Sequence, residues 1–442
     1  MLPQAAPSLP GVAVPVGDRP RPHDVVDAVL ARLAERRGDS AWISLVEPAA
    51  LRARADELEA LPTDLPLYGV PFAVKDNIDV DGLPTTAACP AFAHTPGKDA
   101  GCVARLLAAG AIVVGKTNLD QFATGLNGTR SPYGAPESVF GGDLISGGSS
   151  SGSAVAVASG TVTFALGTDT AGSGRVPAAM NGIVGLKPTR GLIGASGVLP
   201  ACRSLDCVSV FTRDVADVAD VAAVLAGPDP DDPWSRTARP ETVPARPRLA
   251  LADGLDFAGD TAMAAAFADI AGRAAAAAMS TVHVPVAPLV EAGDLLYTGP
   301  WVAERLAGLE GFLADHPGDV LPVTRAVIER GRDFTAVDAF RARHRLQELR
   351  AECNRALLTA DVLLLPTVPT TFTRAQLAEE PVARNLVLGR YTQFANLLDL
   401  AALAVPAGTT PDGRPVGVTL LGPAFAEDRL FAAAHELINP AR

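Results

Sequence analysis

Residues 145–178 read ISGGSSSGSAVAVASGTVTFALGTDTAGSGRVPA, which is a Gly/Ser-rich loop, an apolar stretch and a second loop of small residues. The Gly/Ser-rich segment spans 131–153, and a flexible linker of this composition would need polar flanks. Here an apolar, periodic run follows at once and predicts a helix and then a strand. We therefore expect a structured loop inside a folded core.

The chain before this stretch alternates short apolar strands with a helix. LYGVPFAVKDNIDV (67–80) predicts a strand that ends near Lys75, and AIVVGKTN (111–118) predicts a fully buried strand. Residues 99–110 between them predict a helix that has Asp near its start and Gly at its end. This strand–helix–strand order indicates an α/β architecture.

The rest of the chain adds further elements to the predicted domain. Residues 23–60 predict two amphipathic N-terminal helices around the strand-like WISLVE, 261–279 predict a helix, and 325–360 predict one or two more. LLLPTVP and PVGVTLLGPAF predict strands. The Pro-rich residues 1–22 lack the pattern of a secretion signal and are expected to be a poorly ordered leader. Without an internal repeat or linker, residues 1–442 are expected to form a single domain.

Composition and charge narrow the classes of function. Apolar residues make up 48% and charged residues 19% of the 442 residues, an ordinary globular balance. The net charge of −12 and the lack of a Lys/Arg run disfavour nucleic-acid binding. No apolar segment reaches the roughly 18–20 residues of a membrane span. The five cysteines lack CxxC spacing and indicate free thiols in a reducing cytoplasm, and we expect neither a metal nor a cofactor.

Three polar segments at the ends of apolar runs can each carry chemistry: VKDN (74–77), ISGGSSSGSA (145–154) and GTDTAGSGRVPA (167–178). A lysine at the end of an apolar strand is partly desolvated, which lowers its pKa and allows it to act as a neutral base. A Gly/Ser loop before a helix presents backbone N–H groups to an anion. Small residues before the serine of TDTAGS let backbone amides approach a carbonyl that the hydroxyl attacks.

Taken singly, these segments have ordinary explanations. A lysine after a strand most often reaches to water, and a Gly/Ser loop is most often a turn. A P-loop is excluded because Ser153 and Ala154 stand where Lys and Ser/Thr would be needed. The glycines of the loop do not form GxGxxG, and GxSxG is absent. All six histidines lie outside the three segments, so a Ser–His–Asp triad is not indicated.

GGSSSGSA (147–154) followed by TDTAGSGRVPAAMNGIVGLKPTRG (168–191) resembles the signature stretch of the amidase signature family, and GVPFAVKDNID (69–79) resembles its lysine segment. The match is close over residues 66–215, the signature core. In this family a lysine, a serine after a cis peptide bond and a nucleophilic serine form a triad. The resemblance assigns these to Lys75, Ser149 and Ser173. It also implies a large mixed β-sheet covered by helices on both faces.

The resemblance implies acyl transfer through a relay of protons. Neutral Lys75 would take a proton from Ser149, which in turn takes the proton of Ser173, and Ser173 attacks the amide carbon. The backbone amides from Thr170 through Ala171 and Gly172 to Ser173 would form the oxyanion hole. Many family members have a second Gly where this chain has Ala171, but the contact is through the backbone. Asp169 and Arg175 are either a buried ion pair that holds the loop or a contact to the substrate.

Within the family, five further segments resemble the allophanate hydrolases: LPTTAACPAFA, KTNLDQFATGLNGTRSPYG, PACRSLDCVS, YTGPWVAERLAGLE and YTQFANLLDLAALAVPAG. Allophanate is urea that carries a carboxylate, so its site needs a cation. The resemblance assigns carboxylate binding to Tyr297 and Arg305, with a backbone contact from Gly125. From spacing alone, Arg305 would instead be a solvated residue of a helix that begins near Pro300.

Allophanate hydrolases commonly carry a further C-terminal domain, whereas this chain ends soon after PVGVTLLGPAF. The resemblance therefore implies deamination alone, which gives N-carboxycarbamate and ammonia. Three alternatives remain: an amidase for malonamide-like or biuret-derived acids, a subunit of a tRNA-dependent amidotransferase, and a silent binding protein. The net charge disfavours the second, and the intact triad residues disfavour the third. The expected partner is a small-molecule substrate, and helices 23–60 are a candidate homodimer contact.

Overall fold

The structure is a computed structural model that describes residues 20–239 and 241–438. Most of the expected leader, residues 1–19, lies outside the described residues. The strands are β1 Trp42–Leu45, β2 Pro71–Lys75, β3 Ile112–Thr117, β4 Phe164–Asp169, β5 Val184–Lys187, β6 Cys207–Thr212, β7 Arg248–Asp253, β8 Ser280–Pro285, β9 Val362–Pro366, β10 Ala401–Thr409 and β11 Pro415–Gly422. They form one sheet in the order β1-β3-β2-β4-β6-β5-β10-β11-β9-β7-β8.

The sheet is mixed, as expected. Strand β2 is parallel to both of its neighbours, β3 and β4, while β6, β5, β10, β11 and β9 follow one another in antiparallel pairs. Strands β7, β8 and β9 are again parallel. The carboxyl ends of the parallel strands β2 and β4 therefore lie at the same edge of the sheet, where ligands bind in open α/β sheets.

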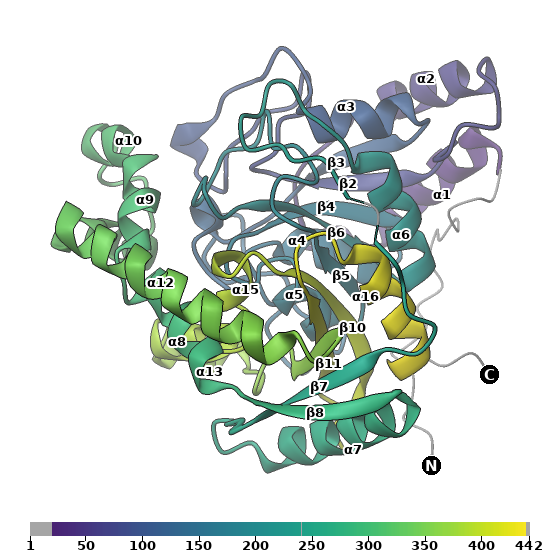
Figure 1. The fold of residues 1–442 in the computed structure, drawn as a ribbon. Coiled ribbons are helices and arrows are strands. Elements are labelled where there is room, and N and C mark those ends of the chain that lie inside the picture. The colour runs from purple at the N-terminus through teal and green to yellow at the C-terminus, as the bar shows by residue number, and fades with distance from the viewer. Residues whose placement is uncertain (1–19, 240, 439–442) are drawn as a thin grey trace.

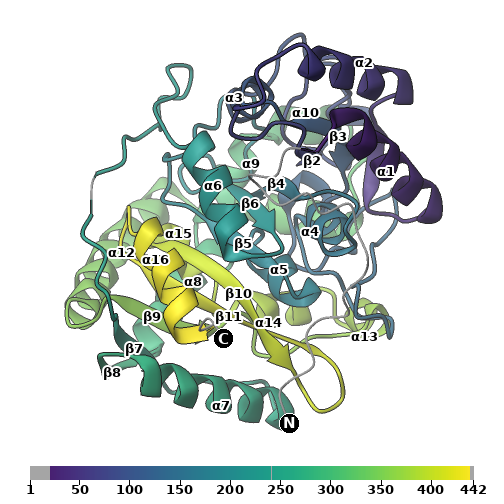
Figure 2. The same cartoon turned by 90° about the vertical axis from the view of Figure 1, so that its right-hand side faces the viewer.

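Helices cover both faces of this sheet (Figures 1 and 2). Their bounds are α1 Pro22–Glu35, α2 Pro48–Glu59, α3 Gly101–Ala108, α4 Ser151–Ala158, α5 Val176–Asn181, α6 Val215–Leu225, α7 Thr261–Ala277, α8 Ala287–Tyr297, α9 Trp301–Ala307, α10 Glu310–Asp315, α11 Pro322–Glu329, α12 Ala336–Leu357, α13 Arg374–Glu379, α14 Ala383–Gly389, α15 Phe394–Leu397 and α16 Glu427–Ala433. None of the helices in the described part of the chain is long and apolar enough to cross a membrane.

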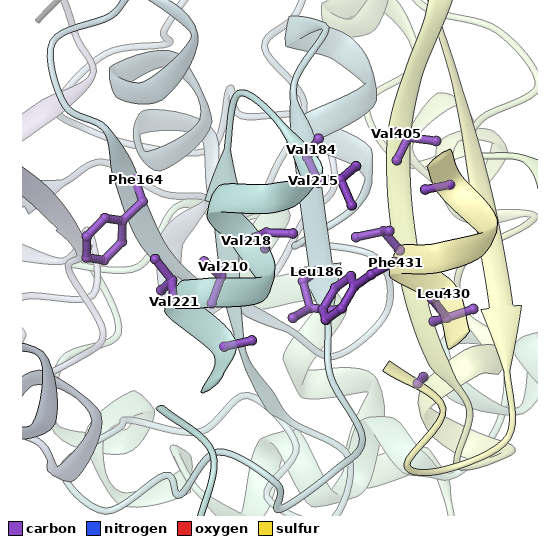
Figure 3. Close-up of a cluster of buried hydrophobic side chains, with 14 of the residues drawn as sticks. Phe164, Val184, Leu186, Val210, Val215, Val218, Val221, Val405, Leu430 and Phe431 are labelled. Carbon is purple, nitrogen blue, oxygen red and sulfur yellow. The ribbon is translucent and has the colours of Figure 1, made fainter. Parts of the chain in front are cut away.

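The alternation of side chains along a strand separates two cores. On β4, Leu166 packs into the cluster that contains residues of α3, α6 and α16, whereas Ala165 packs with residues of α1, α4 and α5. Figure 3 shows part of the first core, where Val210 and Leu186 of the sheet face Val218 of α6. The fold class expected from the resemblance is confirmed.

Most elements predicted from apolar patterns are present. Strand β1 lies between the two N-terminal helices in the chain, and strand β2 ends at Lys75. The Gly/Ser-rich loop leads into α4 and then β4. The sequence interpretation assigned no strand to β5–β8 or β10. Strand β10 was missed because ALAVPAG contains Pro406, which lies where the register with β11 shifts, and a proline in a strand normally argues against one.

Candidate active site

Lys75 is the last residue of β2, and its side chain is fully buried. Its Nζ donates to Ser149 Oγ and to Thr168 Oγ1, both at 2.7 Å. Burial lowers the pKa of Lys75 to about 7, although nearby carboxylates, Asp120 foremost, act in the opposite direction. A substantial fraction of this amine is therefore neutral near pH 7 and can accept a proton.

Ser149 follows a cis peptide bond between Gly148 and Ser149, as the family resemblance implied. Its carbonyl oxygen accepts from the backbone N–H of Asp120 at 3.1 Å. A Cβ atom added to Gly148 would lie 2.6 Å from the backbone nitrogen of Gly128, so only glycine fits this close approach. The loop before α4 thus holds the Ser149 hydroxyl against Lys75.

Ser173 lies in the loop that joins β4 to α5 and is buried. Strand β4, which leads into this loop, contacts the loop of Ser149, since Ser150 Oγ donates to the Thr168 carbonyl at 3.2 Å. The Ser173 hydroxyl makes no hydrogen bond to any other described residue. The structure thus joins Lys75 to Ser149 directly, whereas a bond between Ser149 and Ser173 is absent from the described residues. Catalytic hydrogen bonds often tighten only in the substrate complex.

The backbone amides before Ser173 differ in their partners. The N–H of Gly172 donates to Asp169 Oδ1 at 2.9 Å, so this amide, which was expected in the oxyanion hole, is already occupied. Within the described residues, the amides of Thr170, Ala171 and Ser173 donate to no other group. These three amides are the ones left to meet an anionic oxygen.

Asp169 and Arg175 form the buried ion pair that was one of the two expectations for them. Arg175 donates from Nε and Nη2 to the two carboxylate oxygens, each at 2.9 Å, and both side chains are fully buried. Burial alone would raise the pKa of Asp169, but the guanidinium outweighs it and holds this pKa below its usual value. Since Gly174 also donates to Asp169, the pair braces the loop from within.

Two residues of the segment 391–408 hold the same loop from outside. Thr392 Oγ1 donates to the carbonyl of Ala171 at 2.7 Å, and Asn396 Nδ2 donates to the carbonyl of Asp169 at 2.8 Å. Both carbonyls therefore have hydrogen-bond partners. A backbone with its carbonyls held in this way is preorganised to offer its N–H groups.

Arg305 lies on α9 and is only 2% exposed, so the expectation of a solvated helix residue is wrong. Its Nη1 donates to Thr124 Oγ1 at 2.7 Å and to the carbonyl of Ala123 at 3.1 Å. Its guanidinium carbon lies 5.6 Å from the ring centre of Tyr297, which is also buried. Among the described residues, Nη2 of Arg305 has no hydrogen-bond partner although it is buried. A buried donor without a partner is costly, and a bound ligand is one group that can supply the missing acceptor.

Gly125 directly follows the residue that accepts from Arg305. A Cβ atom at this position would lie 2.5 Å from Asp120 Oδ2, so a side chain is excluded. Asp120 also accepts from the amides of Asn127, Gly128 and Arg130 at 2.9–3.2 Å. The carboxylate of Asp120 therefore shapes the loop that places Gly125 beside Arg305.

Asp206 was not singled out from the sequence, although it lies in the quoted segment PACRSLDCVS. It accepts from Thr170 Oγ1 at 2.5 Å and from the amides of Ala201 and Cys202. Burial raises the pKa of Asp206 to about 6, against the hydrogen bond from Thr170 and the charge of Arg305. An acidic residue in a turn carries no pattern that reveals such partners, so the sequence offered no signal for this role.

Comparisons with known proteins bear on this site. A family model described as Amidase matches residues 24–431. The urea amidolyase of Saccharomyces cerevisiae is 46% identical over 90% of this chain and 22% of its own length. A structure of Kluyveromyces lactis allophanate hydrolase is 41% identical, with a TM-score of 0.89 over 95% of this chain and 71% of that one.

A third relative is matched over nearly its whole length. A glutamyl-tRNA(Gln) amidotransferase subunit from a Synechococcus strain is 32% identical over 94% of this chain and 92% of its own length. By contrast, this chain spans about a fifth of the length of the urea amidolyases that it matches.

Proposed function

This chain belongs to the amidase family, and we propose that it releases ammonia from allophanate and leaves N-carboxycarbamate. The observation that carries the proposal is the buried, unpartnered Nη2 of Arg305 beside Tyr297. The names of two relatives, a urea amidolyase and an allophanate hydrolase, agree with a carboxylated urea as substrate. We propose that this reaction is a step in the metabolism of urea as a nitrogen source.

The proposed reaction begins at Ser173. Neutral Lys75 accepts the proton of Ser149, Ser149 accepts the proton of Ser173, and the Ser173 oxygen attacks the amide carbon. The relayed proton passes to the departing nitrogen, so ammonia leaves and an ester of Ser173 remains. A water molecule, activated through the same relay, then attacks this ester and frees N-carboxycarbamate.

The anionic oxygen of the tetrahedral intermediate would accept from the amides of Thr170, Ala171 and Ser173. Each such donor typically contributes about 3–4 kcal/mol to stabilisation of the transition state. The amide of Gly172 is left out of the proposal because it donates to Asp169. The bond from the Gly172 amide to Asp169 instead keeps the loop in the conformation in which the neighbouring amides can donate to the substrate.

The proposed substrate contact is a carboxylate at Arg305. A guanidinium fork matches the planar carboxylate, and the hydroxyl of Tyr297 and the backbone of Gly125 add further contacts. A neutral amide would leave the buried Nη2 without an acceptor, which costs roughly 1–3 kcal/mol. The site therefore favours a small amide that carries a negative charge at the far end.

Two other functions remain as alternatives. A malonamate-like or biuret-derived acid would place a carboxylate in the same position. A role within a tRNA-dependent amidotransferase is favoured by the nearly full-length match to such a protein, but a net charge of −12 does not suit a surface that meets tRNA.

An assay of ammonia release by the purified chain, without any partner, tests the proposal. Allophanate is expected to be the preferred substrate over malonamate and over a simple neutral amide such as propionamide. Preference for malonamate would change the substrate and keep the mechanism. Turnover of propionamide with none of allophanate would contradict the substrate proposal.

We also propose a cytoplasmic location and a homodimer through α1 and α2. The five cysteines are free and buried, which suits a reducing compartment. Helices α1 and α2 lie at one end of the molecule (Figure 1), where their outer faces carry charged pairs such as Arg52 with Asp27. Light scattering of the purified chain, with Arg52→Glu as the variant, tests the dimer. An unchanged dimer mass in this variant would contradict a contact through these helices.

A further inference from the structure

We propose that the turn 200–206 is a positioning element that holds the Ser173 loop at a set distance from Arg305, with Asp206 and Glu304 as its two anchors. This inference rests on the proposed function of Arg305 as the carboxylate anchor. Neither residue need touch the substrate. Their effect would be to hold the Ser173 loop and Arg305 in alignment, because one small substrate must contact both at the same time.

The first anchor joins the turn to the loop of Ser173. The Asp206 carboxylate accepts from Thr170 Oγ1 at 2.5 Å, and Thr170 contributes one of the three free amides of that loop. The same carboxylate accepts from the amides of Ala201 at 2.7 Å and Cys202 at 3.1 Å. One side chain therefore binds the start of the turn and the catalytic loop together.

The second anchor joins the turn to the helix of Arg305. Glu304 precedes Arg305 on α9, and its two carboxylate oxygens accept from the backbone N–H of Ser204 at 2.7 Å and from Ser204 Oγ at 2.6 Å. Such two-point, charge-assisted bonds fix direction as well as distance. A shift of the turn would therefore carry α9, and Arg305 with it.

Apolar packing supports the same connection. Side chains of the turn, Cys202 and Leu205, belong to one buried cluster with Ala171 of the catalytic loop and Tyr297 of α8. The Cys202 thiol also lies 3.8 Å from the carbonyl of Trp301, the first residue of α9. The inner side of the turn thus touches both parts of the proposed site.

On its other side the turn borders open space. A cavity of about 230 Å³ is lined in part by Pro200, Arg203 and Ser204. Arg190 crosses this side and donates from Nη1 to the carbonyl of Ser204 at 2.6 Å. Asp206 also lines this cavity, so on this side hydrogen bonds at Asp206, Glu304 and Arg190, rather than apolar packing, hold the turn. Misplacement of a reactive group by about 1 Å can cost a hundredfold in rate.

The two anchors should affect catalysis in different ways. Glu304→Gln keeps the shape of the side chain, weakens its hold on Ser204 and should raise KM for allophanate by roughly tenfold, with little change for propionamide. Asp206→Asn acts on the loop that holds the oxyanion and should lower kcat by roughly tenfold or more on both substrates. Ser204→Ala removes a bond to Glu304 from the other side and should repeat the effect of Glu304→Gln in weaker form.

The decisive experiment places Glu304→Gln in an Arg305→Ala background and measures kcat and KM for both substrates. Once the guanidinium of Arg305 is absent, its position no longer matters. Glu304→Gln should then lower kcat/KM for allophanate by less than about a further twofold. Glu310→Gln is the matched control, because Glu310 makes an exposed ion pair with Arg332 and does not touch the turn. This control should behave as the wild type.

Two outcomes would overturn the inference. Either Glu304→Gln retains its full loss in the Arg305→Ala background, or it lowers kcat equally on both substrates, as a general structural defect would. Failure of the proposed function is distinguishable, since the wild type would then show no preference for allophanate and Arg305→Ala would change nothing. Thermal unfolding of each variant separates loss of folding from loss of position.

Discussion

In the proposed mechanism, the protonation state of Lys75 decides whether the reaction can begin. The amine is buried between Ser149 and Thr168, and this burial lowers its pKa to about 7. A base must be unprotonated to accept a proton, so the fraction of active enzyme rises with pH through that value. Single residues set three measurable properties of the proposed enzyme: its pH profile, its nucleophile and its affinity for a carboxylate.

We expect kcat/KM for allophanate to increase with pH and to level off above an apparent pKa of about 7. Asp120→Asn removes the largest opposing charge, so the apparent pKa should move lower. Initial rates measured between pH 5 and 9 follow this rise in kcat/KM. A profile that is flat between pH 5 and 9 would rule out Lys75 as the titrating base.

Ser173→Ala should abolish turnover while the far-ultraviolet circular dichroism stays unchanged. The hydroxyl makes no hydrogen bond to other described residues, so its loss removes the nucleophile without breaking a structural contact. Mass spectrometry after rapid acid quench should detect the ester on the wild type and not on the variant. Full activity of Ser173→Ala would overturn the assignment.

Arg305→Ala should raise KM for allophanate by roughly a hundredfold and change kcat far less, as expected for loss of a ground-state contact. Arg305→Lys keeps the charge but lacks the planar fork, so it should recover only part of the affinity. Steady-state kinetics of the two variants with the same substrate measure the effect. Equal KM values in the wild type and Arg305→Ala would contradict the proposed contact.

At the scale of elements, the loop between β4 and α5 depends on the buried pair of Asp169 and Arg175. Arg175→Met leaves the buried Asp169 uncompensated and should lower the free energy of unfolding by about 3–5 kcal/mol. Arg273→Met is the control, because Arg273 pairs with Asp269 on the exposed face of α7 and should cost under about 1 kcal/mol. Urea denaturation measures both, and equal losses would mean that the buried pair does not brace the loop.

The same loop shows which features of the site could be predicted from the sequence and which could not. Lys75, Ser149 and Ser173 could be proposed as a triad because each lies at the boundary of an apolar run and matches a family motif. The residues that hold the surrounding loops could not, because Asp206 binds Thr170, which is 36 residues earlier in the chain, and Glu304 binds Ser204, which is 100 residues earlier. Long-range contacts of this kind leave no local pattern.

The hydrogen-bond partners of backbone amides could not be predicted from the sequence either. The sequence interpretation placed Gly172 among the amides of the oxyanion hole, yet its N–H is taken by the side chain of Asp169. The sheet shows the same limit, since the apolar pattern revealed β2, β3 and β4, but not β5 and β6, which complete the centre of the sheet. A short strand of four residues, as in β5, holds too few alternations to be told from a loop.

At the scale of the whole molecule, charge opposes the proposed substrate. A net charge of −12 repels an anion at long range, while the buried guanidinium of Arg305 attracts it at short range. Salt screens exposed charges far more than buried ones. We therefore expect kcat/KM for allophanate to rise by roughly twofold between about 20 and 200 mM salt. A neutral amide should show no change, and a fall for allophanate would indicate that surface charge guides the substrate in.

In the proposed function, Arg305 selects a carboxylated amide for attack by Ser173. Biuret matches allophanate except that a neutral carboxamide replaces the carboxylate, so the ratio of the two kcat/KM values isolates this contact. We expect the wild type to favour allophanate by at least about a hundredfold and Arg305→Ala to lose most of this ratio. A wild-type ratio near one, or a ratio unchanged in Arg305→Ala, would contradict it.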